Sequence, residues 1–241
     1  MNRKLKADWQ DTKRLFRSLP SVVAALFTIS VVTMNLLANK TIYQSELLAL
    51  DGGILISWLS FLCMDIVTKA FGPKAATKLS VFATLVNLLV CLIYYAVSAI
   101  PTETDYTAFN AIIGGTWFIL LSSTVAFLSS AAVNNFLNAA IGRLFRKDPD
   151  GKAAYVTRAY VSTFIGQFID NYVFAALTFT VFAPIFWDGF HWTQLQCVTC
   201  SLLGAALELL MEVFFSPIGY LVLKSWKKDG VGEAYRKEET A

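Results

Sequence analysis

The chain has 241 residues, of which 56% are hydrophobic and only 15% are charged, and its formal net charge is +3. Its mean hydropathy of +0.56 lies well outside the range of an ordinary soluble domain. This composition predicts an all-α integral membrane protein, excludes a large soluble domain with its own core, and gives no support for a nucleic-acid partner.

Six apolar segments follow one another along the chain, each long enough to cross a bilayer. They are predicted at about residues 21–39, 53–71, 79–100, 109–141, 154–183 and 194–223. The first segment is longer than the apolar core of a secretory signal and no small-x-small cleavage site follows it, so a span is expected there. The predicted division is a basic tail at 1–20, a transmembrane domain at 21–223 and a second tail at 224–241.

The basic residues indicate how the chain is oriented in the membrane. All 20 Lys and Arg residues except Lys40 fall in the two tails or in and beside the second-to-third and fourth-to-fifth connections. Since Lys and Arg accumulate in cytoplasmic loops, this pattern predicts six spans with both termini in the cytoplasm. The expected location is the plasma or inner membrane.

The chain contains few residues of the kinds that bind a metal ion or a cofactor. It contains one histidine, His191, and one C-x-x-C pair, Cys197 with Cys200, whereas a metal site would need further ligands. No nucleophile elbow, zinc-protease motif or phosphate-binding loop occurs. The sequence therefore predicts no catalytic residues, no metal and no cofactor, and a function other than that of an enzyme.

Carboxylates inside the apolar segments carry the strongest functional signal, because a charge at the bilayer centre costs about 2.5–3.5 kcal/mol. Glu208 and Glu212 share a face of the sixth segment. Asp65 lies four residues before Lys69, so an ion pair and a ligand site are equally favoured there. Asp170 has no basic residue within a turn, which favours a site on a solute pathway over a purely structural role.

Amide side chains accompany these carboxylates at helical spacing, so that each set shares one face of its helix. These sets are Asn35 with Asn39, Asn134 with Asn138, and Gln167 with Asp170. Such amides either line a polar interior or join helices by hydrogen bonds, and both interpretations remain open. Paired amides in segments one and four, with a buried Asp in segments two and five, suggest a 3+3 inverted repeat, as in many secondary transporters.

Two stretches, MDIVTKAFGPKAATK and STFIGQFIDNYVFAALTF, resemble the queuosine-precursor transporter family, also called the vitamin uptake transporter family. The matching residues are Asp65, Thr68, Lys69, Phe71, Gly72, Ser162, Thr163, Gln167, Asp170 and Phe174, with Ser123, Ala126, Pro217 and Tyr220 elsewhere. This resemblance implies import of 7-deazaguanine bases, the precursors of the tRNA nucleoside queuosine, without a dedicated ATPase.

Three positions depart from the pattern of that family. Asn134 stands where many relatives have an Asp, a Gln is replaced near Ala131, and a Lys is replaced near Glu208. These positions lie on the polar face and change the charge of the expected pocket. A different deazapurine, a nucleoside or another planar heterocycle therefore remains open as the substrate.

A guanine-like ligand presents an N1–H and an exocyclic amine that one carboxylate can accept side by side. Asp170 or Glu208 is expected to supply that carboxylate. The other expected substrate-binding residues are Gln167, Asn171, Asn39, Asn134, Asp65, Trp117 and Phe174. The expected partners are a small planar heterocycle and the lipid bilayer, with no nucleic acid, and a homo-oligomer is left open.

Two alternatives come from other classes of protein. The chain could be the substrate-capturing subunit of an energy-coupling-factor vitamin importer, with Ala24, Ala25 and Thr28 forming a docking surface for the coupling module. It could instead be a structural membrane protein whose polar groups only hold helices together. Co-purification with a coupling module would favour the first alternative, and loss of protein abundance in neutral variants of Asp65 and Asp170 would favour the second.

Overall fold

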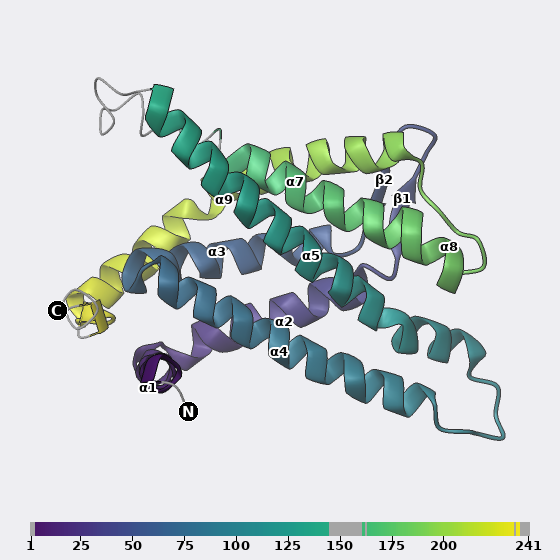
Figure 1. Ribbon diagram of the computed structural model, residues 1–241, viewed down its shortest axis with the longest axis horizontal. Helices are drawn as coiled ribbons and strands as arrows, with labels where there is room; N and C mark the ends of the chain where they lie inside the picture. Colours follow the sequence, from purple (N-terminus) through teal and green to yellow (C-terminus); the bar gives the residue numbers. More distant parts are fainter. Residues whose placement is uncertain (1–2, 145–160, 162, 234, 237–241) are drawn as a thin grey trace. The chain divides into compact units, whose positions relative to one another are not determined.

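The computed structural model describes residues 3–144, 161, 163–233 and 235–236 (Figure 1). Its helices are α1 (Arg3–Ser18), α2 (Ser21–Leu37), α3 (Ile54–Phe71), α4 (Pro73–Ser98), α5 (Thr107–Leu144), α7 (Thr163–Ala175), α8 (Ala183–Phe186) and α9 (Gln194–Lys228). A π-helix, η2 (Ala176–Phe182), joins α7 to α8, and two short strands are β1 (Thr41–Gln44) and β2 (Ala49–Asp51). The protein is an all-α multi-pass membrane protein, as its composition predicts.

Five stretches of the described chain are long and apolar enough to cross a membrane: Ile54–Phe71, Pro73–Ser98, Thr107–Ser130, Phe164–Phe186 and Gln194–Phe215. A sixth is counted if α1 and α2, which meet at a bend of 106°, are taken as one broken span. Alone, α2 has 17 residues, slightly fewer than the roughly 20 that span a hydrocarbon core. Five of the six predicted segments, the second to the sixth, are matched in order by these stretches, and α2 lies at the first predicted segment but is shorter.

The basic tail predicted at residues 1–20 is largely helical. α1 ends at Ser18, and Pro20 disfavours helical geometry in Leu19 before it, which explains the break between α1 and α2. Lys78 of α4 forms ion pairs with Asp8 at 2.8 Å and with Asp11 at 2.6 Å. The tail is therefore an ordered helix fixed to the start of α4.

The chain forms two compact units. The first comprises Met1–Met34, Leu55–Val90 and Met211–Ala241, and the second comprises Asn35–Ile54 and Cys91–Leu210. Buried side chains of α1, α2, α3 and α4 build the core of the first unit, among them Leu15, Phe27, Val67, Phe71 and Leu79. The predicted inverted repeat and the predicted division into tails and one transmembrane domain remain predictions.

In the second unit, the connection between α2 and α3 forms a β-hairpin. Thr41 of β1 lies opposite Asp51 of β2, and Gln44 lies opposite Ala49. The register shifts between Thr41 and Tyr43, which is the signature of a β-bulge. The backbone N–H of Ser45 donates to Leu48 O at 2.7 Å and closes the turn.

The fifth span contains the π-helical segment η2. The backbone N–H of Ala183 donates to Thr178 O, five residues earlier, which is the π-type bond. α7, which precedes η2, packs along α5, and Ser130 of α5 donates a side-chain hydrogen bond to Gly166 O at 2.9 Å. Because π-helical turns are rare and concentrate at functional sites, the second unit is the place to look for the site.

Candidate functional site

The start of α9 is built by a capping box. The backbone N–H of Thr193 donates to Gln196 Oε1 at 2.7 Å, and the N–H of Gln196 donates back to Thr193 Oγ1 at 3.2 Å. Both bonds satisfy donors that would otherwise be unpaired at the helix start. From there α9 presents Cys200, Gly204 and Glu208 at intervals of four residues, so the three share one face of the helix.

Among the predicted carboxylates whose side chains the structure describes, Glu208 is the most deeply buried, with 6% of its surface exposed. Asn171 of α7 donates a long hydrogen bond from Nδ2 to Glu208 Oε2 at 3.5 Å. Gly204 makes this approach possible, since a Cβ atom there would lie 2.8 Å from Asn171 Nδ2. Asn171 of α7 and Gly204 and Glu208 of α9 therefore place an amide group beside a buried carboxylate.

Two further carboxylates act on Glu208 electrostatically. One is Asp170, next to Asn171 on α7, and the other is Asp51 at the end of β2. Asp51 Oδ1 accepts a hydrogen bond from Gly53 N at 2.7 Å. Burial raises the pKa of Asp51 to about 6, against the opposing effect of the Gly53 N–H. We refer to Asp51, Asp170 and Glu208 together with Asn171 as the carboxylate cluster.

The charge of the carboxylate cluster determines which ligands it can bind. Among the described residues that act electrostatically on Glu208, none is a lysine or an arginine. Carboxylates left without a basic partner in a membrane protein need hydrogen-bond donors, a cation or protons. The carboxylate cluster is therefore suited to a ligand with several N–H donors or a positive charge.

Three other predicted residues lie in the same unit. Gln167, one turn before Asn171, has a buried Oε1 atom without a hydrogen-bond partner in the described structure. Phe174 packs edge-on against Phe179 at 6.3 Å, and Trp117 packs edge-on against Phe118 at 6.0 Å. Both aromatic rings take part in packing, and their proposed stacking on a ligand remains a prediction.

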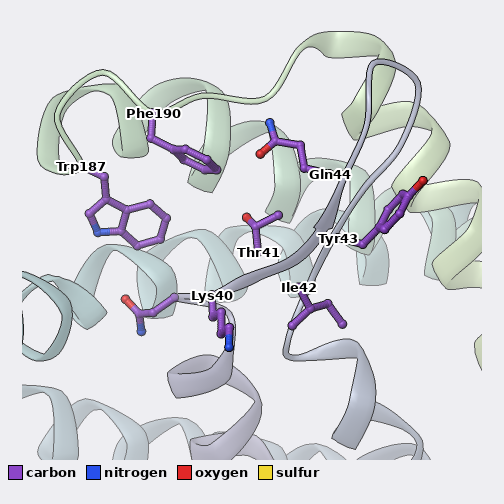
Figure 2. Close-up of a pocket in the computed structure, with 8 residues that line it drawn as sticks. Lys40, Thr41, Ile42, Tyr43, Gln44, Trp187 and Phe190 are labelled. Atoms are coloured by element: carbon purple, nitrogen blue, oxygen red, sulfur yellow. The ribbon is translucent and has the colours of Figure 1, made fainter.

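The remaining predicted residues have other surroundings. Asp65 belongs to the first unit and forms an ion pair with Lys69 at 2.6 Å. Asn39 donates to Leu36 O at 3.0 Å and to Thr116 Oγ1 at 3.2 Å, and it lines a pocket beside β1 (Figure 2). The side chains of Asn134 and Glu212 lie outside the described residues, as does Ser162. A direct role for Asp65 and Asn134 remains a prediction.

Sequence reasoning missed Asp51 and Gly204. Asp51 lies in the connection between the first two apolar segments, and nothing in its local sequence distinguishes it from another acidic loop residue except the Gly-Gly pair that follows. Gly204 could have been noticed because it lies one helical turn before Glu208, where a missing side chain leaves room for a neighbour. Both became visible only through contacts between distant segments.

Comparison with known proteins agrees with this architecture. A family described as "Putative vitamin uptake transporter" matches residues 51–222, which is most of the chain. The chain therefore belongs to the vitamin uptake transporter family of multi-pass membrane proteins. It is 25% identical over 160 residues to a "Probable queuosine precursor transporter" of Bacillus subtilis (strain 168), covering 64% of this chain and 67% of the relative. No solved structure matches it.

Proposed function

We propose that this protein imports queuosine precursors, 7-deazaguanine bases or queuine, across the plasma or inner membrane. The family of the chain supports a transport function, and the name of the Bacillus subtilis relative supports this class of solute. The observation that carries the proposal is the buried contact between Asn171 and Glu208, with Asp170 and Asp51 close enough for their charges to act on Glu208.

The chemistry of a deazaguanine base fits the carboxylate cluster. Its N1–H and exocyclic amine are adjacent donors, and a carboxylate accepts two parallel N–H bonds with its two oxygens. Glu208 or Asp170 takes this role in the proposal. Asn171 and the unpartnered Oε1 of Gln167 would serve the remaining polar atoms of the base.

The same arrangement would provide selectivity. A ligand without the donor pair would leave a buried carboxylate unsatisfied, and sites built on buried hydrogen bonds reject such analogues strongly. An N–H-rich base would therefore be preferred over an apolar molecule of equal size. The proposed transport moves the base unchanged, so no group in the carboxylate cluster acts as a catalyst.

The test is a feeding experiment. The protein is expressed in a bacterium that can neither make nor import queuosine precursors, and 7-cyano-7-deazaguanine, 7-aminomethyl-7-deazaguanine or queuine is supplied separately. Queuosine in tRNA is then followed by its retarded migration in a boronate gel, with an empty vector as control. A shift with at least one compound is expected, and the absence of any shift while the protein is present in the membrane would refute the proposal.

A further inference from the structure

We propose that the pocket beside β1 is a second binding site, which takes a flat aromatic heterocycle of the deazaguanine class before it reaches the carboxylate cluster. The pocket has a volume of about 380 Å³ and is lined by Asn39, Lys40, Thr41, Ile42, Tyr43, Gln44, Trp187 and Phe190. None of these residues belongs to the carboxylate cluster. The inference rests on the proposed function for the identity of the ligand.

Two aromatic rings form one wall of the pocket. Figure 2 shows the rings of Trp187 and Phe190 on the side facing Thr41 and Gln44 of β1. The ring of Trp187 is held by Phe118 at 5.3 Å and Phe179 at 6.2 Å between ring centroids. A ring fixed in this way gives a heterocycle a stacking surface without the entropy cost of ordering a mobile side chain.

The opposite wall is polar because of the β-bulge. In a regular strand Thr41 and Tyr43 would point to the same side, whereas Gln44 would point to the other. The register shift between Thr41 and Tyr43 changes this alternation. Thr41 and Gln44 both point toward the aromatic wall, and Tyr43 points away from it (Figure 2). Strand β1 therefore offers a hydroxyl and an amide opposite the aromatic rings.

Two lining residues carry buried polar atoms without partners in the described structure. They are the Oδ1 acceptor of Asn39 and the Nε1–H donor of Trp187. Both atoms are buried, and Trp187 Nε1 lies toward Gly115 of α5, so neither atom faces the pocket; the polar groups that do so are the Thr41 hydroxyl and the Gln44 amide. A heterocycle with both N–H and carbonyl groups matches them, whereas a lipid chain does not.

The volume of the pocket favours a ligand with a single bicyclic ring system. Ligand pockets generally measure about 300–1,000 Å³, and this pocket lies near the lower end of that range. A single bicyclic base fits such a volume better than a nucleotide does. Lys40, on the lining, adds a donor suited to a carbonyl oxygen.

The hairpin connects this pocket to the carboxylate cluster. Thr41, which lines the pocket, lies directly opposite Asp51 in the register of the two strands. The turn of the hairpin is fixed to α9 because Gln196 donates from Nε2 to Ser45 O. One anchored hairpin thus contributes a wall to the pocket and a carboxylate to the cluster, so a base bound in the pocket lies one strand away from Asp51.

The test measures the initial rate of uptake of labelled 7-cyano-7-deazaguanine by cells over a range of concentrations. The variants are Phe190→Leu and Gln44→Ala, because Gln44 is exposed and Phe190 is only half-buried. Loss of the stacking ring is expected to raise the half-saturation concentration about threefold to tenfold, with a maximal rate within about twofold of wild type. Trp9→Leu, which removes an aromatic ring 60% exposed on α1, is the matched control and should change neither value.

The outcomes separate this inference from the proposed function. If wild type takes up the base but both pocket variants keep its half-saturation concentration, the pocket is a water-filled hollow and the inference is wrong, while the proposed function stands. A fall in maximal rate alone, at equal protein in the membrane, would assign the pocket residues a structural role and would also overturn it. If wild type takes up none of the precursors, the proposed function and this inference fail together.

Discussion

Gly204 is the residue whose small size matters most to the candidate site. Replacing it by alanine would place a Cβ atom 2.8 Å from Asn171 Nδ2, so the amide must move away from Glu208. Because a net hydrogen bond contributes about 0.5–1.5 kcal/mol, we expect Gly204→Ala to lower uptake about twofold to tenfold. The measurement is precursor uptake normalised to the amount of protein in the membrane.

Gly219→Ala is the control for that substitution, because both glycines lie in α9 and both changes raise helix propensity by a similar amount. A Cβ atom at Gly219 would meet the end of Leu62 at 3.3 Å and Ile66 Cγ1 at an ordinary contact distance of 3.7 Å. Its uptake should stay near that of wild type. Equal uptake by both variants would contradict the role given to Asn171.

Asp51 predicts a pH-dependent stability. Because burial raises its pKa to about 6, the folded protein binds this proton more tightly than the unfolded chain does. The resulting stabilisation is complete below the ordinary carboxyl pKa and is lost as the pH rises through about 6. Asp51→Asn, which keeps the oxygen that Gly53 N–H contacts, should therefore melt at a higher temperature than wild type near neutral pH but not near pH 4.

The melting temperature of the purified protein at several pH values checks this prediction. Glu46→Gln is the control, since Glu46 is exposed in the turn of the same hairpin. Other acids near Asp51, such as Glu208, remain in both proteins, so only the difference between wild type and variant is interpreted. A difference that stays constant with pH would show that Asp51 is not the group responsible.

For single residues, the sequence identified as site candidates those whose side chains are energetically costly to place in a membrane. Asp170 and Glu208 stood out because a carboxylate in an apolar segment needs a reason. Asp51 did not stand out, because an acidic side chain in a loop stays solvated unless the loop folds back onto the protein. The proximity of Asp51 to Glu208 depends on the hairpin, which no local pattern indicated.

Among the elements, the β1–β2 hairpin and the start of α9 are linked by Gln196, and Thr199 of α9 also donates to Leu47 O in the turn. Gln196 caps α9 through Oε1, which accepts from Thr193 N, and fixes the hairpin through Nε2, which donates to Ser45 O. Gln196→Glu keeps the acceptor and removes the donor, whereas Gln196→Ala removes both. We expect faster amide hydrogen exchange at residues 45–51 in both variants, and faster exchange at the first turn of α9 only in Gln196→Ala.

Hydrogen exchange followed by mass spectrometry can resolve these two peptides. The exchange of α5, which has no contact with Gln196 among the hydrogen bonds described above, serves as the internal reference. Unchanged exchange at residues 45–51 in Gln196→Glu would mean that the bond to Ser45 does not hold the hairpin.

Hydrophobicity predicted the helices well and their irregularities poorly. The apolar segments had to become helices, because a bilayer leaves no other way to satisfy the backbone. The π-helical turns of η2 could not be predicted, since the stretch ALTFTVF is as apolar as an ordinary helical span. The helical structure of α1 was also missed, because its charged residues were explained by the membrane rule alone.

For the whole molecule, the pairing of the two chain ends supports the predicted topology. Tyr235 donates a hydrogen bond from its hydroxyl to Asp11 Oδ2 at 3.1 Å, so α1 and the C-terminal tail meet within the first unit. Two ends in contact lie on one side of the membrane, which requires an even number of spans. We expect both ends to be cytoplasmic, because the basic residues gather there.

Reporter fusions can measure this orientation. Green fluorescent protein should fluoresce when fused to either end, and alkaline phosphatase should be active when fused after Glu103, in the connection between α4 and α5. An active phosphatase at the C-terminus alone, with the N-terminus in the cytoplasm, would contradict the even number of spans. An active phosphatase at both ends would preserve that number and reverse the orientation.

The most direct test of the central claim is precursor uptake by Glu208→Gln compared with wild type. The substitution keeps the size of the side chain and exchanges one carboxylate oxygen beside Asn171 for an amide nitrogen, which cannot accept a hydrogen bond from the base. Leaving a buried hydrogen-bonding group without its partner costs about 1–3 kcal/mol, so uptake should fall about fivefold or more. Glu46→Gln should take up the precursor normally, and equal amounts of both variants should reach the membrane. Wild-type uptake by Glu208→Gln would contradict the claim that the carboxylate cluster recognises the precursor.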